Sequence, residues 1–157
     1  MEIKLGNFAD PRVKALLEYH LRGMHQNSPP GHVFALDWSA LQKPEIKLYT
    51  GWLGEKLVVM GALKTLPGGM GELKSMRVAE GEGGKGYGAL MLEHLIAEAR
   101  HAGMKRLSLE TGTGPAFEPA LQLYRSRGFV VGGAFADYEQ SDFCTFFHLD
   151  LNTAPRQ

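Results

Sequence analysis

A glycine-rich segment in the middle of the chain constrains its fold and function more than any other feature. Five of the eight residues from Gly81 to Gly88 are glycine, and a helix-forming segment, residues 89–103, follows directly. Glycine costs conformational entropy and supplies no side chain for packing, so such a segment is useful where a ligand must approach the backbone closely. Free backbone N–H groups and the helix dipole favour anions at a helix start. The segment therefore predicts a binding site for a phosphate-bearing ligand.

Hydrophobic periodicity and turn residues predict strands and helices on both sides of this segment. The short turns before it favour an antiparallel meander, and the strand–loop–helix–strand order around it requires one parallel crossover. We therefore predict an α+β fold with a mixed, mostly antiparallel sheet flanked by helices. We expect one domain over residues 1–151 and a loose tail at 152–157. The predicted strands are 2–5, 45–52, 56–66, 71–79, 105–111, 129–138 and 142–151, and the predicted helices are 10–24, 89–103 and 118–128.

Composition and charge exclude several classes of function. Lys plus Arg equals Asp plus Glu at 17 each, so the chain has no bulk field that favours nucleic acid or an anionic membrane. No run approaches the roughly 18 apolar residues of a membrane helix. Cys144 is the single cysteine, which excludes an intrachain disulfide and favours a cytoplasmic location. The six histidines and Cys144 form no metal-ligand pattern, so we expect no metal.

Two common phosphate-binding motifs fit the glycine-rich segment poorly. A Walker A loop needs a Ser or Thr after Gly-Lys and a glycine five residues earlier, and both are missing. The dinucleotide fingerprint G-x-G-x-x-G matches Gly81, Gly83 and Gly86, with Glu110 near the place of a ribose-binding acid. Three antiparallel strands precede that match, however, and only 47 residues follow Glu110, too few for a doubly wound sheet. A flexible loop with incidental glycines is the remaining alternative.

The segment from Gly83 to Gly88 resembles the pyrophosphate loop Q/R-x-x-G-x-G/A of the GNAT N-acetyltransferases, with Gly83 in place of the usual Gln or Arg. Residues 72–92, "ELKSMRVAEGEGGKGYGALML", resemble the family's central strand, loop and helix, and "PALQLYRSRGF" at 119–129 resembles its later A-x-x-L-Y-x-x-x-G-F motif. "SPPGHVFALD" and "FADY" are similar to the small bacterial YsnE-type subgroup. The resemblance implies a GNAT fold whose parallel strands splay to admit acetyl-CoA.

The resemblance further implies an acetyl-CoA-dependent N-acetyltransferase that acts in a ternary complex on the amine of a small molecule or on a peptide N-terminus. A homodimer would be common in this family. The glycine-rich segment would hold the pyrophosphate, with Lys85 replacing the charge missing at position 83, and Phe117 stands where many relatives have Asn. The residues expected to bind acetyl-CoA are Met76, Arg77, Val78, Gly83, Gly84, Lys85, Gly86, Tyr87, Gly88, Ala89, Phe117 and Tyr124.

Acetyl transfer to an amine needs a base, because a free alkylamine with a pKa near 10 is mostly protonated at neutral pH. Glu72 is the first candidate, six residues before Val78, where the resemblance places a catalytic glutamate. Strand alternation predicts that Glu72, Lys74, Met76 and Val78 share one face. Glu110, at the end of a predicted strand, is the second candidate. A surface carboxylate paired with Lys74 is the structural alternative for Glu72.

The reaction also needs a donor for the oxyanion and a proton for the thiolate. The resemblance assigns the first to the Met76 backbone N–H and the second to Tyr124. From spacing alone, Tyr124 shares a helical face with Phe117 and Leu121 and is a core residue.

Further residues are candidates for the acceptor pocket, and three other functions stay open. His25 and His32 would border that pocket, as would Asp137 and Tyr138. The alternatives are a regulatory domain that binds CoA without catalysis, a dinucleotide-binding protein, and an acyltransferase for longer acyl chains.

Overall fold

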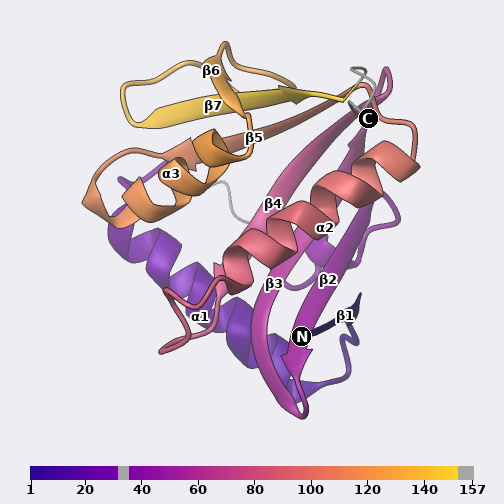
Figure 1. Cartoon of the computed structure of the whole chain (residues 1–157). Helices are drawn as coiled ribbons and strands as arrows, with labels where there is room; N and C mark the ends of the chain where they lie inside the picture. Colours follow the sequence, from indigo (N-terminus) through magenta and orange to yellow (C-terminus); the bar gives the residue numbers. More distant parts are fainter. Residues whose placement is uncertain (32–35, 152–157) are drawn as a thin grey trace.

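The computed structural model describes residues 1–31 and 36–151, which form a seven-stranded sheet with helices on both faces (Figure 1). The strand order is β1-β2-β3-β4-β5-β7-β6, and all neighbours in it are antiparallel except β4 and β5. This architecture confirms the predicted α+β fold. The elements are β1 (Glu2–Leu5), α1 (Pro11–Asn27), β2 (Ile46–Leu53), β3 (Lys56–Leu66), β4 (Met70–Val78), α2 (Tyr87–His101), β5 (Arg106–Gly112), α3 (Glu118–Ser126), β6 (Val130–Gly132) and β7 (Cys144–Asp150), with 3-10 turns at Ala40–Gln42 and Pro115–Phe117.

The predicted bounds of the strand at 129–138 were wrong. The predicted strand 129–138 is reduced to β6, and residues 133–143 form an irregular loop. Its backbone is incompatible with a strand, since Ala136 has a φ of 51°. The aromatic side chains that suggested a strand instead pack against β7, where the Phe135 ring lies 5.9 Å from that of Phe146. The predicted tail, 152–157, lies outside the described residues, and the single domain over 1–151 stays a prediction.

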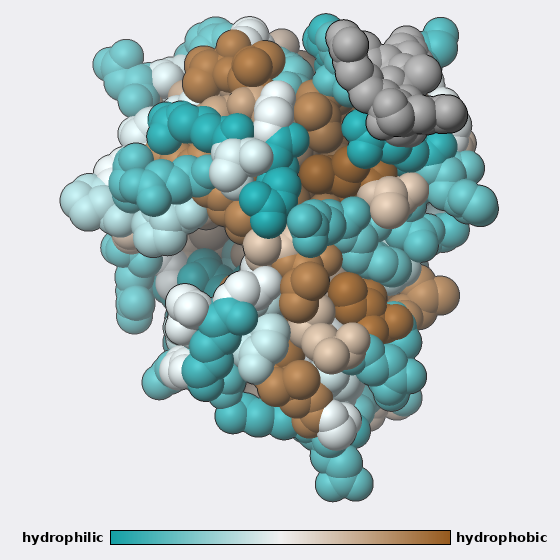
Figure 2. Space-filling view, viewed as in Figure 1, coloured by the Kyte–Doolittle hydropathy of each residue, from teal (hydrophilic) through white to brown (hydrophobic). Residues whose placement is uncertain are grey.

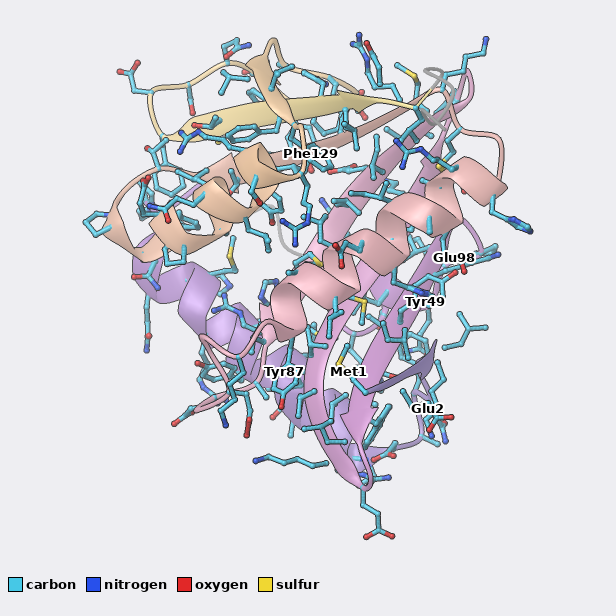
Figure 3. The ribbon with its side chains drawn as sticks, viewed as in Figure 1. Met1, Glu2, Tyr49, Tyr87, Glu98 and Phe129 are labelled. Atoms are coloured by element: carbon cyan, nitrogen blue, oxygen red, sulfur yellow. The ribbon has the colours of Figure 1, made fainter. Side chains whose placement is uncertain are left out.

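The sheet separates two apolar clusters. On one face, α2 and α3 cover a core that includes Leu95 and Leu109, and on the other face α1 buries Val13 and Leu17. Tyr49 of β2 ties the first layer together, because its hydroxyl donates to the Glu98 carboxylate of α2 at 3.3 Å (Figure 3). No helix in the described part of the chain is both long and apolar enough to cross a membrane.

A β-bulge in β4 is the feature of the sheet that most affects the site. Ser75 has a φ of 55°, and the register between β3 and β4 shifts by one residue there. The extra residue reverses the facing of the rest of the strand. Glu72 and Lys74 therefore face the α1 side, whereas Met76 packs in the α2 cluster. The prediction that Glu72, Lys74, Met76 and Val78 share one face was wrong for this reason.

The parallel strands separate just beyond the point where they pair. β4 and β5 are in register only from Met70 to Glu72, opposite Arg106 to Ser108. Both strands continue beyond that point, to Val78 and Gly112. The predicted splay is thus present, and it leaves main-chain groups of β4 without a strand partner on its β5 side.

Gly61→Ala tests the close packing between β3 and α2. A Cβ at position 61 would lie 2.7 Å from Met76 Sδ and 2.8 Å from Leu95 Cδ1. Overpacking of this kind costs about 1–3 kcal/mol. We expect a loss of that size in the free energy of unfolding, measured by urea denaturation. Gly83→Ala is the matched control, since nothing lies within 4 Å of a Cβ there; equal losses in both variants would contradict this account.

Candidate active site

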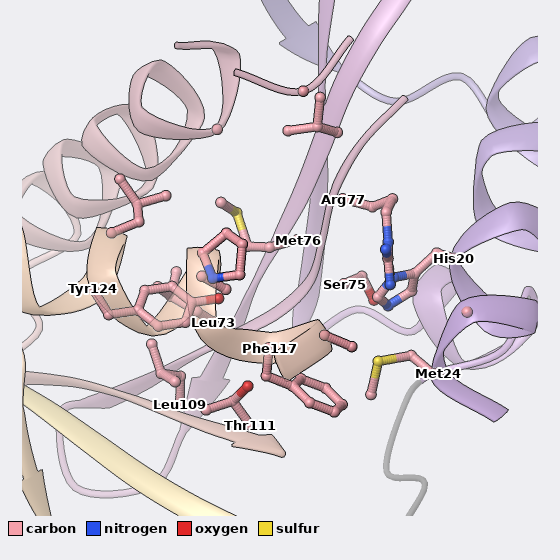
Figure 4. A pocket seen from close by; sticks show the side chains of 18 of the residues that line it. His20, Met24, Leu73, Ser75, Met76, Arg77, Leu109, Thr111, Phe117 and Tyr124 are labelled. Carbon is pink, nitrogen blue, oxygen red and sulfur yellow. The ribbon is translucent and has the colours of Figure 1, made fainter. Parts of the chain in front are cut away.

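A cleft of about 550 Å³ opens where β4 and β5 separate. Its walls come from β4, β5, the glycine-rich segment, the start of α2, the 3-10 turn before α3, α3 itself and the C-terminal half of α1. The space-filling view shows the surface hollowed beside α2 (Figure 2), and Figure 4 shows the side chains that line the cleft. All the residues expected to bind acetyl-CoA line it except Lys85 and Tyr87.

The glycine-rich segment forms an open loop at the start of α2. Gly84 and Gly86 have φ values of 76° and 87°, a region that strains residues with a Cβ. Gly86 caps the helix, and the first intrahelical bond at this end runs from Leu90 N to Gly86 O. The N–H groups of the preceding helical residues therefore have no intrahelical acceptor. A Cβ at Gly83, Gly84 or Gly86 would meet no atom of the described residues within 4 Å, so these residues leave the space in front of this backbone open.

Glu82 ties this loop to the sheet. Its carboxylate pairs with Lys56 of β3 and, at 3.0 Å, with Lys85. Hydrogen bonds from these two lysines lower the pKa of Glu82. The charge of Lys85, expected to face a pyrophosphate, is thus already matched by Glu82 in this structure. Sequence reasoning missed Glu82, because nothing in the local pattern shows that Lys56 lies next to it.

The two candidate bases lie in different environments. Glu72 is 2% exposed and does not line the cleft. Its carboxylate accepts a hydrogen bond from the Tyr138 hydroxyl at 2.6 Å and pairs with Lys74 at 3.2 Å. Glu110 lines the cleft, and burial raises its pKa, with a hydrogen bond to Cys144 acting in the opposite direction. Glu72 is therefore enclosed by partners, whereas Glu110 faces the open space.

Tyr124 lies at the inner end of the cleft, close to Met76 and Leu73 (Figure 4). Its ring packs in the α2-side core against Phe129 and Phe147. Burial raises the pKa of Tyr124 to about 12. Within the described residues its hydroxyl makes no hydrogen bond. Tyr124 is therefore both a core residue, as its spacing predicted, and a residue of the cleft wall, as the resemblance implied.

Sequence reasoning missed His20 of α1, which reaches the same cleft. The Arg77 Nε–H donates to His20 Nδ1 at 3.0 Å (Figure 4). Because Nδ1 accepts, His20 is neutral and carries its proton on Nε2. Burial, followed by the charge of Arg77, lowers the pKa of His20 to about 3. No local signal could have paired these residues, which lie 57 positions apart.

The other candidates for the acceptor pocket are dispersed. His25 is exposed and does not line the cleft, and Asp137 is exposed as well. His32 lies outside the described residues. Phe117 does line the cleft, with its ring 5.6 Å from that of Phe143. Among residues 1–31 and 36–151, no group of three or more His, Cys, Asp or Glu side chains could hold a metal ion.

Tyr138→Phe tests whether the Tyr138 hydroxyl stabilises the buried Glu72 carboxylate. The Tyr138 hydroxyl donates to Glu72 at 2.6 Å and accepts a hydrogen bond from Lys74 Nζ at 2.7 Å, so the substitution removes both contacts. Losing a hydrogen bond to a charged group costs about 1–3 kcal/mol, and we expect the free energy of unfolding to decrease by at least that amount. Tyr19→Phe is the control, since the hydroxyl of this half-buried tyrosine makes no hydrogen bond in the described part of the chain. Equal stability of Tyr138→Phe and the wild type in urea denaturation would contradict the role given to this contact.

Comparisons with known proteins agree with this geometry. Residues 13–129 match the acetyltransferase (GNAT) family. The chain is 42% identical over 149 residues to the uncharacterized N-acetyltransferase YedL of Escherichia coli (strain K12), covering 95% of this chain and 94% of that protein. It is 41% identical over 151 residues to the uncharacterized N-acetyltransferase YsnE of Bacillus subtilis (strain 168), covering 96% and 100%.

Among solved structures, the chain is similar to a Bacillus subtilis acetyltransferase in complex with CoA, with a TM-score of 0.70 and 20% identity over 95% of this chain and 97% of that one. That likeness agrees with the fold, and the sequence matches extend over most of the chain. The chain therefore belongs to the GNAT acetyltransferase family and is an acyltransferase.

Proposed function

We propose that this protein transfers the acetyl group of acetyl-CoA to the amine of a small molecule, or to a peptide N-terminus, by direct attack in a ternary complex. The observation that carries this proposal is the single cleft that runs from the glycine-rich loop to the gap between β4 and β5. One end offers free N–H groups to a phosphate, and the other brings Glu110 and Tyr124 to one space. CoA bound in a structure of the same fold supports the choice of cofactor.

The cofactor would lie along backbone rather than along charged side chains. The N–H groups at Gly84, Gly86, Gly88 and Ala89 would hold the pyrophosphate, aided by the dipole of α2. Beyond Glu72, β4 pairs with no described strand on its β5 side, so its main-chain groups are available to the amides of the pantetheine arm. Gly83 fits this arrangement, because a small residue there leaves the approach to the loop open.

We assign the role of general base to Glu110. It is the candidate carboxylate that lines the cleft, and its raised pKa makes it a better proton acceptor near neutral pH. Glu72 has both its hydrogen bonds committed to Tyr138 and Lys74, and its charge contributes to the raised pKa of Glu110. In this proposal the negative charge of Glu72 helps to raise the pKa of Glu110. The alternative is that Glu72 itself acts as the base through a water molecule.

The proposed reaction accounts for each proton. The amine, mostly protonated in water, first loses one proton to solvent. The neutral amine then attacks the thioester carbonyl carbon, and the oxyanion accepts a hydrogen bond from the Met76 N–H next to the bulge. Glu110 takes the proton from the attacking nitrogen. The C–S bond then breaks, and Tyr124 gives its hydroxyl proton to the departing thiolate. Because its pKa is about 12, Tyr124 is protonated at the start of each cycle at neutral pH.

Glu110→Gln tests the assignment of the base. General-base catalysis contributes about 100- to 10,000-fold, and we expect kcat/KM for the amine to fall by that factor while the affinity for acetyl-CoA is unchanged. The wild type should lose activity as pH falls through the raised pKa of Glu110, since only the carboxylate accepts a proton, and the variant should lack this acid limb. The readout is release of the CoA thiol with an amine found by screening.

Glu72→Gln is the matched comparison for that experiment. If Glu110 is the base, this variant keeps the acid limb, shifted toward lower pH because a neighbouring negative charge is gone. A larger loss of kcat/KM in Glu72→Gln than in Glu110→Gln, with the acid limb gone, would reverse the assignment.

Tyr124→Phe tests the acid. Removal of the hydroxyl should lower kcat about 100- to 10,000-fold, the range for proton transfer, with little change in the acetyl-CoA dissociation constant. If the leaving thiolate does not need a proton from Tyr124, the variant will show no change. A kcat within about 2-fold of the wild type would therefore contradict the role of Tyr124.

A further inference from the structure

We propose that the amine acceptor also carries a carboxylate, as in an amino acid, and that Arg77 binds this carboxylate in the cleft. The inference rests on the proposed acetyltransferase function and names the class of its acceptor. Four observations support it. The Arg77 guanidinium has no carboxylate partner in the described residues, and His20 holds it in place. Ser75 beside it has a buried hydroxyl that is unpaired among those residues, and Arg77 and Glu110 lie on the same face of the sheet.

The guanidinium of Arg77 is a half-buried positive charge without a carboxylate. Within residues 1–31 and 36–151, Arg77 forms no ion pair with any Asp or Glu. Its Nε–H is used by His20, and neither Nη1 nor Nη2 donates to a described residue. Neither nitrogen is sealed from solvent, and the residue lines the cleft. Two parallel N–H donors thus remain for a ligand, in the geometry that matches a carboxylate.

Burial of this charge is unfavourable in the free protein. Desolvation lowers the pKa of Arg77, the direction expected for a positive charge partly removed from water. A partly buried charge normally has a paired counter-ion. A carboxylate from the acceptor would supply that counter-ion at the moment of binding.

His20 and Tyr19 hold the guanidinium in place. His20 accepts the Nε–H, and the Arg77 guanidinium carbon lies 5.6 Å from the centre of the Tyr19 ring. His20 can accept only while Nδ1 is unprotonated, and its low pKa of about 3 keeps it so across the ordinary pH range. His20 is therefore a positioning residue. A guanidinium oriented before binding loses less side-chain entropy when the ligand arrives.

Ser75 supplies a further unusual group on the same wall. Its hydroxyl is buried and has no hydrogen-bond partner among the described residues, although the residue lines the cleft. Its φ of 55° is rare for a residue with a Cβ, and such strain is concentrated at functional sites. An acceptor oxygen bound at Arg77 would give this donor a partner after a rotation about χ1.

The position of Arg77 fits an acceptor rather than the cofactor. The register with Met60 places its side chain on the α1 face of β4, and Glu110 lies on the same face of β5, opposite to the α2 cluster. The glycine-rich loop begins α2 on the other face. A molecule with an amine toward Glu110 and a carboxylate toward Arg77 would span the acceptor side, with Met24 and Phe117 as apolar walls.

The test compares acceptors that differ in whether they carry the negatively charged carboxylate. The twenty standard amino acids, their carboxamides and the matching decarboxylated amines are assayed with acetyl-CoA by thiol release. Binding of the same compounds to the protein saturated with CoA is measured by calorimetry. We expect at least one amino acid to be favoured over its amide by about 10- to 100-fold in kcat/KM and in affinity, the range of a charge-assisted hydrogen bond pair.

Variants then assign the preference to Arg77. Arg77→Gln should reduce the ratio between acid and amide to about 1, and Arg77→Lys should give an intermediate ratio, since it keeps the charge and loses the fork. Arg22→Gln is the control, because Arg22 is an exposed arginine of the same helix that carries His20 and does not line the cleft. Its ratio should equal that of the wild type.

Each result bears on the inference separately from the acetyltransferase proposal. Preferential binding of carboxylates without turnover would support the inference and contradict the proposed reaction. Three results would overturn the inference. Amides and plain amines could be acetylated as fast as amino acids, or no amino acid could bind at about 10 mM, on the order of the weakest useful affinity. Phosphoethanolamine could also be preferred over all carboxylates. A loss of acetyl-CoA affinity in Arg77→Gln, with the acceptor ratio unchanged, would instead assign Arg77 to the cofactor.

Discussion

The bulge at Ser75 is the constraint on which the rest of the site depends. One extra residue in β4 turns Met76 into the α2-side core and Arg77 toward α1. The same region of β4 has already lost its pairing with β5, so the strand keeps hydrogen bonds to β3 and exposes its other edge. A regular strand at this point would leave Met76 and Val78 on the same face as Glu72 and Lys74. The φ of 55° at Ser75 is the local strain that the surrounding core has to hold.

The sheet also divides the chemistry between its two faces. The side with α2 and α3 offers backbone N–H groups and the enclosed ring of Tyr124, which suit a long, polar cofactor and a leaving thiolate. On the α1 side, Glu72 pairs with Lys74 and accepts a hydrogen bond from Tyr138, while Arg77 has no carboxylate partner in the described part of the chain. Burial raises the pKa of Glu110, which lies on the α1 face of β5. Glu72, which has a paired lysine, therefore has a structural role, whereas Glu110, which faces the cleft, is the proposed functional carboxylate.

Local sequence patterns predicted the parts of this molecule that depend on local physics. The glycines at 84 and 86 indicated a backbone that a ligand can approach closely, and the periodicity of 89–103 indicated the helix that follows, so the loop and its position were predictable. The resemblance supplied Tyr124, whose apolar spacing indicates only a core residue. The strand boundary at 129–138 failed because aromatic residues in a loop that packs against β7 give the same pattern as a strand.

Contacts between distant residues could not be predicted in the same way. The partners His20 and Arg77, or Glu72 and Tyr138, come from separate elements, and no spacing rule relates them. The bulge was unpredictable as well, because alternation in β4 assumes a regular strand and Ser75 carries no sign of a left-handed backbone. Both effects altered the expected site, since they enclosed Glu72 and placed Arg77 beside α1.

The central claim is that the glycine-rich loop and the separated strands bind acetyl-CoA. Thermal unfolding of the wild type and of Gly86→Asp with acetyl-CoA, CoA or NAD tests it most directly. A ligand at about 100 times its dissociation constant adds roughly 2.7 kcal/mol, which raises the midpoint by roughly several degrees for a domain of this size. We predict this shift with both CoA species and not with NAD, and its loss in Gly86→Asp. No shift at saturating acetyl-CoA, or a shift with NAD alone, would contradict the account.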